Sequence, residues 1–238
     1  MRQGKMYVDS SKEKKVMNEQ LLQLMSRFKT IIHDDLSIEM KKYAEDHHVP
    51  IIQEQGLELM LQLLRIKNPS AILEIGTAIG YSSLMMARHL PHTKIVSIER
   101  DPVRYQEAVS YHERASIGNQ VVLIEADALE IENNQLPILQ YDVIFIDAAK
   151  AQYQKFFEKY EPLLKEDGMI ISDNLIFHGH IFDNQQKQSR NLKQLVRKIN
   201  RYNEWLAQHE GYDTLLLPIG DGVAISMKKN KEILKEHC

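Results

Sequence analysis

The chain has 238 residues, of which 43% are hydrophobic and 26% are charged. This length and composition are typical of one globular domain, and no Pro/Gly/Ser-rich linker divides the sequence. The 30 basic and 33 acidic residues nearly cancel, which excludes a generally basic nucleic-acid-binding protein and leaves only a local basic patch for such contacts. No run reaches the roughly 20 apolar residues of a membrane span. The single cysteine, Cys238, forms no internal disulfide, so we expect a cytoplasmic protein.

The N-terminal part of the sequence predicts a flexible arm followed by helices. Residues 1–16 are basic, with Lys12, Lys14 and Lys15, and they lack the apolar segment of a signal peptide. Residues 17–238 are predicted to form a single domain. Apolar residues at spacings of three and four predict its first helices, which cover residues 18–34, 36–46 and 53–66.

From Ala71 the pattern changes to short apolar runs that alternate with longer helix-like segments. This alternation predicts an α/β core over residues 71–229, in which helices cover both faces of a mostly parallel, Rossmann-like sheet. The predicted parallel strands cover residues 71–75, 94–98, 120–124, 142–146 and 169–173. Two late runs, 212–220 and 222–228, are too close together for a crossover helix and are predicted to pair antiparallel at a sheet edge. Ligands of such sheets bind at the carboxyl ends of the strands, so strand-end residues are the candidates for chemistry.

The first strand ends in the sequence LEIGTAIGYSS, which contains two glycines. Gly76 and Gly80 allow a sharp turn and the close approach of a ligand, and a helix that begins near Tyr81 and Ser82 directs its amides to the same place. The spacing G-x-x-x-G, with Ala78 in the middle, differs from the dinucleotide-binding G-x-G-x-x-G. A strand-to-helix turn that binds nothing is the alternative interpretation.

Acidic residues end the next two strands. Glu99 follows the glycine turn by about 20 residues, the position from which a carboxylate accepts hydrogen bonds from ribose hydroxyls. Asp101, just before Pro102, is a better N-cap for the following helix than Glu99. Asp127 ends the third strand, where it could hydrogen-bond an adenine amino group or cap a helix, and the sequence leaves both open.

Together these features resemble the class I S-adenosylmethionine-dependent methyltransferases. The resemblance implies S-adenosyl-L-methionine as the cofactor, with Glu74 at its methionine portion, Glu99 at the ribose and Asp127 at the adenine. The missing third glycine fits this cofactor, because it has no pyrophosphate. Further cofactor contacts are expected from Ile51, Gly76, Ala78, Tyr81, Ser82, Ala126 and Asp147.

The fourth and fifth strands also end in oxygen-bearing side chains, Asp147 in one and Asp173 with Asn174 in the other. Two neighbouring parallel strands deliver them to the same edge of the sheet. Carboxylate and amide oxygens suit Mg²⁺, or another hard divalent cation such as Ca²⁺ or Mn²⁺. Any one of them alone could equally cap a helix. The imidazoles of His178 and His180 do not fit an all-oxygen set and are predicted to line the acceptor pocket or a loop.

With these residues the chain resembles the metal-dependent O-methyltransferases related to catechol and caffeoyl-CoA methyltransferases. The resemblance covers residues 49–229 and is carried by VPIIQEQG, ILEIGTAIGYSSL, IER, EADA, IFIDAAKAQY, ISDNLIF and LLLPIGDGVAIS. It implies that Asp147, Asp173 and Asn174 hold the metal, and that Lys150, on the first turn of the next helix, is the catalytic lysine. A nearby cation eases deprotonation of the acceptor hydroxyl and lowers the pKa of Lys150, whose neutral amine can take the proton. Relatives often dimerise, so a homodimer is expected.

The acceptor is expected to offer two adjacent oxygens, as a catechol or a 5-hydroxyuracil base does. Residues 187–201 hold six basic residues and no acid. Four of them share one helical stripe that could hold RNA phosphates or be an ordinary solvated face: Arg190, Lys193, Arg197 and Arg201. The pattern most resembles the bacterial tRNA 5-hydroxyuridine methyltransferases, which implies the anticodon loop of tRNA, at the wobble position, as the partner. A small catechol-type acceptor is the alternative substrate. A third interpretation is that the protein is a non-catalytic nucleotide-binding module.

Overall fold

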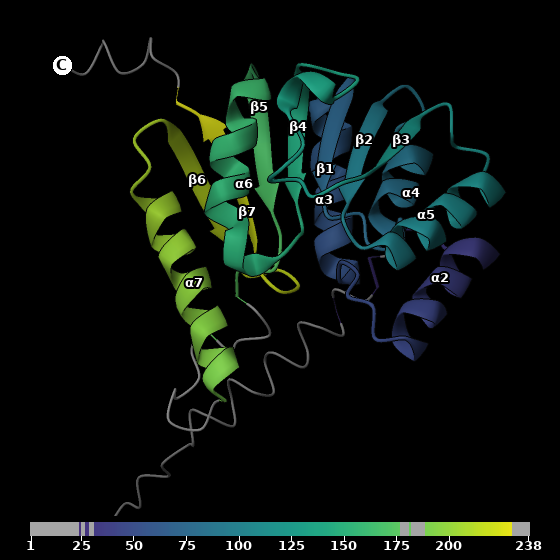
Figure 1. The fold of residues 1–238 in the computed structure, drawn as a ribbon, viewed down its shortest axis with the longest axis horizontal. Coiled ribbons are helices and arrows are strands. Elements are labelled where there is room, and N and C mark those ends of the chain that lie inside the picture. The colour runs from purple at the N-terminus through teal and green to yellow at the C-terminus, as the bar shows by residue number, and fades with distance from the viewer. Residues whose placement is uncertain (1–23, 25–26, 29–30, 177–180, 182–188, 230–238) are drawn as a thin grey trace, which may run out of the picture. The chain divides into compact units, whose positions relative to one another are not determined.

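The computed structural model describes residues 24, 27–28, 31–176, 181 and 189–229 (Figure 1). The chain divides into two compact units, residues 1–34 and 35–238, and the fold and site below lie in the second unit. The predicted arm over residues 1–16, most of the predicted helix over residues 18–34, and both His178 and His180 lie outside the described residues.

A seven-stranded sheet with the order β3-β2-β1-β4-β5-β7-β6 forms the centre of the second unit. Its parallel strands are β1 (Ala71–Ile75), β2 (Lys94–Glu99), β3 (Val121–Glu125), β4 (Tyr141–Ile146) and β5 (Leu164–Ser172). β7 (Val223–Lys228) pairs antiparallel with β5, and β6 (Tyr212–Leu217) pairs antiparallel with β7 at the edge. The predicted Rossmann-like sheet and its antiparallel edge are therefore confirmed.

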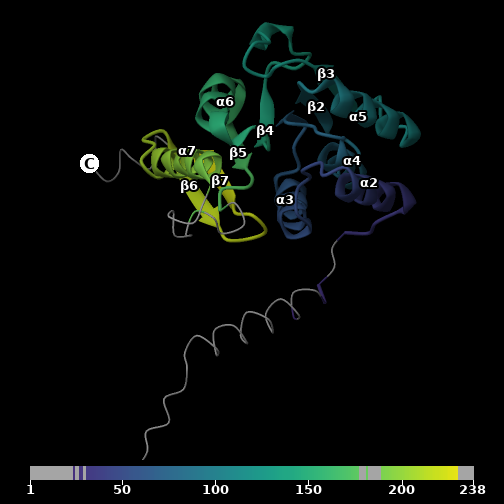
Figure 2. The same ribbon diagram turned by 60° about the horizontal axis from the view of Figure 1, so that its bottom comes forward.

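The helices lie on both faces of this sheet. α2 (Asp35–Asp46) and α3 (Glu54–Lys67) precede β1 and confirm two predicted helices. α4 (Tyr81–His89) joins β1 to β2, α5 (Pro102–Arg114) joins β2 to β3, and α6 (Tyr153–Tyr160) joins β4 to β5. The chain progresses in opposite directions from β1 and from β4, so right-handed crossovers put α4 and α5 on one face and α6 on the other (Figure 2). α7 (Arg190–Ala207) packs beside α6, with the rings of Trp205 and Phe157 5.1 Å apart.

The connection from β3 to β4 departs from the predicted alternation of strands and helices. Residues 126–140 contain a 3₁₀ turn over Asn133–Gln135 and no α-helix. Two adjacent asparagines and Pro137 explain the difference, because these residue types disfavour helix interiors. The segment is fastened to α6 instead, where Lys159 Nζ donates to the carbonyl oxygen of Ile131 at 2.6 Å.

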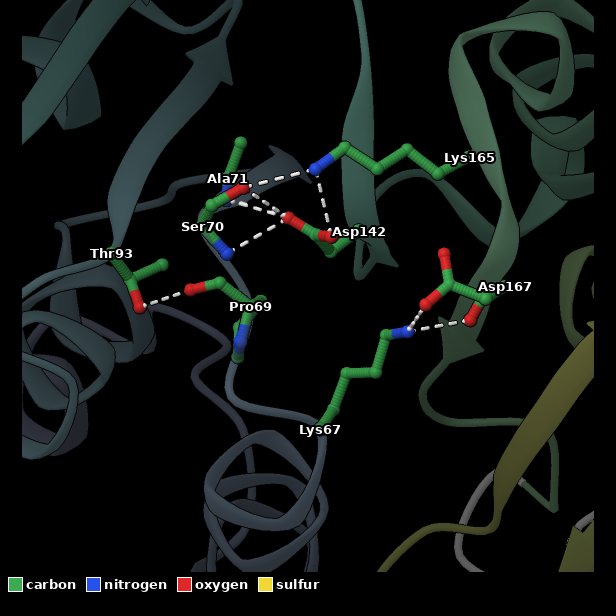
Figure 3. Close-up of polar contacts among 8 residues, drawn as sticks. All are labelled: Lys67, Pro69, Ser70, Ala71, Thr93, Asp142, Lys165 and Asp167. Atoms are coloured by element: carbon green, nitrogen blue, oxygen red, sulfur yellow. Dashed lines mark hydrogen bonds and ion pairs between the residues drawn. The ribbon is translucent and has the colours of Figure 1, made fainter.

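Asp142 joins the amino ends of β1, β4 and β5, at the sheet edge opposite the strand-end residues (Figure 3). Its carboxylate accepts hydrogen bonds from the amides of Ser70 and Ala71 at 2.8 and 2.9 Å, and Lys165 Nζ lies 2.9 Å from Oδ1. Burial raises the pKa of this carboxyl, but the hydrogen bonds from Lys165, Ser70 and Ala71 outweigh burial and lower the pKa to about 2. Ionised Asp142 therefore stabilises the folded state.

We expect Asp142→Asn to reduce the free energy of unfolding at neutral pH by about 2 kcal/mol, the equivalent of lowering a pKa from 3.8 to about 2. Because the folded-state pKa is depressed, the contribution is present above about pH 4 and is lost as the pH falls towards 2. Urea unfolding should therefore show a difference from wild type that narrows with acidification. Asp213→Asn, at an exposed position of β6, is the matched control. Equal stability of Asp142→Asn and wild type at neutral pH would contradict this role.

Candidate active site

A cavity of about 240 Å³ lies at the carboxyl ends of the parallel strands. All five parallel strands contribute to its wall at or just after their last residue, through Gly76, Glu99, Ala126, Asp147 and Asn174. The predicted cofactor residues Ile51, Ala78, Tyr81, Ser82 and Asp127 line the same cavity. The lining residues without a predicted role include Arg100, Arg104 and Phe156. Nine of the ten residues proposed for the cofactor therefore line one cavity, all except Glu74.

The glycine turn after β1 packs directly against the end of β4. Gly76 has a φ of +99° and Gly80 a φ of +83°, both in the left-handed region that favours glycine. A Cβ added to Gly76 would lie 2.1 Å from the carbonyl oxygen of Asp147, so no side chain fits there. Ala78 also has a left-handed φ, +47°, and its amide donates to Glu99 Oε2 at 2.8 Å. This hydrogen bond therefore fastens the glycine turn to Glu99 at the end of β2.

Glu99 is held in place at the cavity wall by backbone amides. In addition to Ala78, the amides of Arg100 and Asp101 each donate to Glu99 Oε1 at 2.9 Å. Asp101, not Glu99, caps α5, as predicted: its Oδ1 accepts from the amides of Val103 and Arg104 at 3.0 and 3.1 Å. The Glu99 carboxylate is thus a fixed acceptor facing the cavity, suited to a ligand with hydroxyl groups.

Asp127 caps a turn rather than a helix, and its predicted contact with an adenine stays a prediction. Its Oδ1 accepts a hydrogen bond from the amide of Leu129 at 2.8 Å, which caps the turn after β3. Its Oδ2 lies 3.5 Å from Arg100 NH1, and the residue lines the cavity. Asp127 Oδ1 therefore stabilises the turn, while Asp127 Oδ2 lies beside Arg100.

Glu74 lies behind the cavity wall. The residue is fully buried, and its carboxylate accepts hydrogen bonds from the hydroxyls of Ser82 and Ser97. Burial is the main cause that raises its pKa, to about 7, and the hydrogen bonds from the two serines act in the opposite direction. Of this group only Ser82 lines the cavity, so Glu74 is connected to the cavity through its hydrogen bond with Ser82.

The predicted metal ligands meet at the ends of β4 and β5. Asp147 and Asn174 line the cavity, and burial followed by the charge of Asp147 raises the pKa of Asp173. Within the described residues, no donor reaches the buried atoms Asp173 Oδ1 and Asn174 Oδ1. Buried acceptors without partners are costly, and a hard cation would satisfy both. The residues present therefore fit a divalent cation.

Carboxylates alone do not make this site. In the described parts of the chain, no three Asp, Glu, His or Cys side chains are grouped closely enough to hold a metal ion. The predicted set of metal ligands has only two carboxylates, and its third ligand is the amide oxygen of Asn174. Asn174 has a left-handed φ of +71°. That backbone conformation turns Asn174 towards the cavity directly after Asp173.

Asp221 is an acidic neighbour of the site that had no predicted role. It lies in the turn between β6 and β7 and is 6% exposed. Burial is the main cause that raises the pKa values of Asp147 and Asp173, and the negative charge of Asp221 raises both further. The backbone of this turn is tied to the chain after Asn174, since Ile176 N donates to Asp221 O at 2.7 Å. The motif LLLPIGDGVAIS contains this residue, but no local pattern indicates that the edge hairpin turns back onto the site.

Lys150 lies on the cavity wall beside these carboxylates. It begins a 3₁₀ turn, Lys150–Gln152, just before α6, so it precedes the helix on whose first turn it was expected. Burial lowers its pKa, while the charges of Asp147, Asp221 and Asp173 act in the opposite direction. The net effect is a lysine that releases its proton more readily than a solvated one, which a general base requires.

The predicted basic stripe lies apart from the cavity wall, on α7. Arg190, Arg197 and Arg201 are exposed and Lys193 is half-buried, while the opposite side of the helix is buried through Val196, Ile199, Tyr202 and Leu206. None of the four stripe residues belongs to the described cavity lining. Their contact with RNA stays a prediction.

Comparison with known proteins identifies the family. Residues 8–229 match the model of the O-methyltransferase family. A catechol O-methyltransferase of Niastella koreensis is 32% identical over 189 residues, which cover 74% of this chain and 80% of that protein. A solved structure from Staphylococcus aureus, provisionally described as a caffeoyl-CoA O-methyltransferase, has 42% identity and a TM-score of 0.80, covering 90% of this chain and 100% of that one. The O-methyltransferase of Bacillus cereus solved with SAH has 26% identity and a TM-score of 0.73, covering 87% and 96%.

The chain therefore belongs to the O-methyltransferase family, which its match over residues 8–229 shows. Its chemistry is S-adenosylmethionine-dependent O-methyl transfer, which confirms that part of the resemblances seen in the sequence, whereas dependence on a metal stays a prediction. The finer resemblance, to tRNA 5-hydroxyuridine methyltransferases, stays a prediction. Among the described residues, no helix has the length and apolar character that crossing a membrane requires.

Proposed function

We propose that this protein methylates one oxygen of an adjacent oxygen pair on a small catechol-type acceptor, with the help of a divalent cation. One arrangement carries the proposal. The buried oxygens Asp173 Oδ1 and Asn174 Oδ1, which receive no hydrogen bond from the described residues, lie at the strand ends beside Asp147 and Lys150, next to the cavity. An oxygen-rich cation site with a lysine of lowered pKa suits deprotonation of an acceptor hydroxyl.

The chain's own residues would orient the reactants and move one proton. When bound, the cofactor supplies an activated methyl group, and the cation supplies positive charge that makes a nearby hydroxyl more acidic. Asp147, Asp173 and Asn174 would hold the cation through their oxygens. Glu99 would accept hydrogen bonds from the ribose, which fixes the cofactor relative to the strand ends. Lys150 would take the acceptor proton at Nζ.

A small aromatic acceptor is the best-supported substrate class. The Niastella koreensis relative is named for catechol, and the solved Staphylococcus aureus structure is described by caffeoyl-CoA. In a catechol the two oxygens are adjacent, so both can reach one cation while one of them faces the methyl group. This geometry explains why an enzyme would place a cation site beside the cofactor cavity.

A 5-hydroxyuridine in tRNA is the second candidate acceptor, and the exposed face of α7 favours it. Its base has an equivalent oxygen pair, and Arg190, Arg197 and Arg201 point away from the buried side of α7, as a phosphate-binding face would require. The net charge of −3 means that this local face would have to supply the attraction.

The acceptor is tested by supplying labelled S-adenosylmethionine and Mg²⁺ with catechol, with phenol, and with an RNA oligonucleotide that contains 5-hydroxyuridine. We expect catechol to be methylated and phenol to react about 100-fold more slowly, because phenol lacks the second oxygen that fixes its orientation. Arg197→Glu, on the exposed face of α7, should leave catechol methylation unchanged.

Other outcomes of this assay separate the two candidates. Label in the RNA but not in catechol, with a loss of RNA labelling in Arg197→Glu, would select the tRNA acceptor. Equal rates with catechol and phenol would contradict the need for an oxygen pair, and with it the proposed role of the cation.

A further inference from the structure

Helix α6 begins and ends with a buried tyrosine, and each tyrosine donates a hydrogen bond to the backbone of a different part of the site. Tyr153 is 1% exposed, and its hydroxyl donates to the carbonyl oxygen of Asp173 at 2.9 Å. Tyr160 is 0% exposed, and its hydroxyl donates to the carbonyl oxygen of Ala128 at 2.5 Å. Residues seven apart lie on nearly the same side of a helix and about 10 Å apart along it. One short helix therefore contacts both ends of the site.

At the metal end, Tyr153 holds the backbone between the two strand-end oxygen ligands of β5. Asp173 N donates to the carbonyl oxygen of Ile146 at 3.1 Å, and this bond fixes the position of Asp173 relative to the end of β4. The next residue, Asn174, has a left-handed φ of +71°, a conformation that persists only where its surroundings hold it. The hydroxyl of Tyr153 binds the carbonyl group that links these two residues, so it fixes the peptide from which Asn174 is oriented.

Two further contacts hold the chain just after the ligands. Leu175 N donates to the carbonyl oxygen of Gly222 at 2.9 Å, and Asn203 Nδ2 of α7 donates to the carbonyl oxygen of Leu175 at 3.1 Å. At the peptide between Asp173 and Asn174, the carbonyl oxygen of Asp173 accepts its hydrogen bond from Tyr153. Second-layer hydrogen bonds of this kind orient metal ligands and affect metal affinity.

At the cofactor end, Tyr160 holds a segment that has no helix of its own. Ala128 lines the cavity with Ala126 and Asp127, in the connection over residues 126–140. Without an α-helix, the position of this wall depends on bonds from neighbouring elements. Lys159 binds the same connection further along, at Ile131, whereas Tyr160 binds it at a residue of the cavity wall.

We propose that Tyr153 and Tyr160 are positioning residues that divide the site between them, Tyr153 for the metal ligands and Tyr160 for the cavity wall at the end of β3. The assignment of Tyr153 rests on the proposed function, because it requires the cation site. The assignment of Tyr160 requires only cofactor binding. Removing either hydroxyl leaves a buried carbonyl oxygen without its donor, so the local backbone shifts while the ring still fills its place.

The variants Tyr153→Phe and Tyr160→Phe test the proposal and serve as controls for each other. Both lose one hydroxyl at an equally buried position of the same helix, and the Tyr153 ring keeps its edge-to-face packing against Tyr202 at 5.5 Å. The measurements are Mn²⁺ affinity of the chelator-stripped protein, by electron paramagnetic resonance, and S-adenosylhomocysteine affinity, by calorimetry. We expect Tyr153→Phe to weaken Mn²⁺ binding about tenfold and to leave S-adenosylhomocysteine affinity within about twofold of wild type. We expect the reverse pattern for Tyr160→Phe.

Three results are distinguishable from this expectation. Equal weakening of both ligands by both variants, with matching losses of thermal stability, would show general structural roles and overturn the proposal. Wild-type affinities in both variants would overturn it as well. If wild-type protein bound no Mn²⁺, the proposed function would lose its cation and Tyr153 its assignment, while the S-adenosylhomocysteine affinity of Tyr160→Phe would still decide the role of Tyr160.

Discussion

Replacing Lys150 with methionine is expected to lower kcat by about 10²- to 10⁴-fold, the usual contribution of a general base. Methionine keeps much of the chain length but cannot accept a proton. Because burial lowers the pKa of Lys150 from its ordinary value of 10.5, the wild-type rate should rise with pH and level off below that value. The variant should lose this rise. The measurement is the pH dependence of kcat for methyl transfer to catechol.

A matched control separates loss of the base from general damage. Lys155→Met changes an exposed lysine on α6, and we expect it to keep wild-type kcat. Binding of S-adenosylhomocysteine should be the same in both variants and in wild type, because Lys150 would act on the acceptor. A Lys150→Met enzyme with wild-type kcat and an unchanged pH profile would show that the proton leaves by another route.

Gly76→Ala is expected to cost about 4 kcal/mol or more of unfolding free energy and to abolish cofactor binding. The added Cβ would lie 2.1 Å from the carbonyl oxygen of Asp147, and the φ of +99° is strained for any residue with a side chain. Relief of the clash requires the glycine turn and the end of β4 to separate, and both line the cavity. Urea unfolding and calorimetric titration with S-adenosylhomocysteine measure the two effects.

Gly118→Ala is the control for Gly76→Ala, because a Cβ added to Gly118 meets nothing within 4 Å. We expect its stability to stay within about 0.5 kcal/mol of wild type and its cofactor affinity to be unchanged. If Gly76→Ala bound S-adenosylhomocysteine as tightly as Gly118→Ala, the close packing of the turn against β4 would not matter for the cofactor.

Much of the fold and cavity could be predicted because short-range patterns determine them. The run of β1 matches its observed bounds, Ala71–Ile75, because a strand buried on both faces has a mostly apolar sequence, interrupted here only by Glu74. Parallel strands end at one edge, so knowing where each apolar run stops was enough to gather Glu99, Asp127 and Asp147. Asp101 could be recognised as the cap of α5 from Pro102 alone.

The remaining features depend on contacts between distant segments, which no local pattern reports. Asp221 reaches the site because the β6–β7 turn folds back onto the chain after Asn174. In the sequence, Tyr153 and Tyr160 cannot be distinguished from ordinary core residues. The carbonyl oxygens that their hydroxyls bind become apparent only in the structure. Glu74 was placed at the cofactor by resemblance, whereas Ser82 and Ser97 enclose its carboxylate behind the cavity wall.

Whether catechol methylation depends on a divalent cation decides whether the oxygens of Asp147, Asp173 and Asn174 hold a cation that the reaction needs. Protein treated with a chelator would be assayed with labelled S-adenosylmethionine before and after Mg²⁺ is restored, with S-adenosylhomocysteine affinity measured in parallel. We expect methyl transfer to disappear without Mg²⁺ and to return with it, while S-adenosylhomocysteine still binds. Undiminished methylation of catechol in the presence of the chelator would contradict a cation held by Asp147, Asp173 and Asn174.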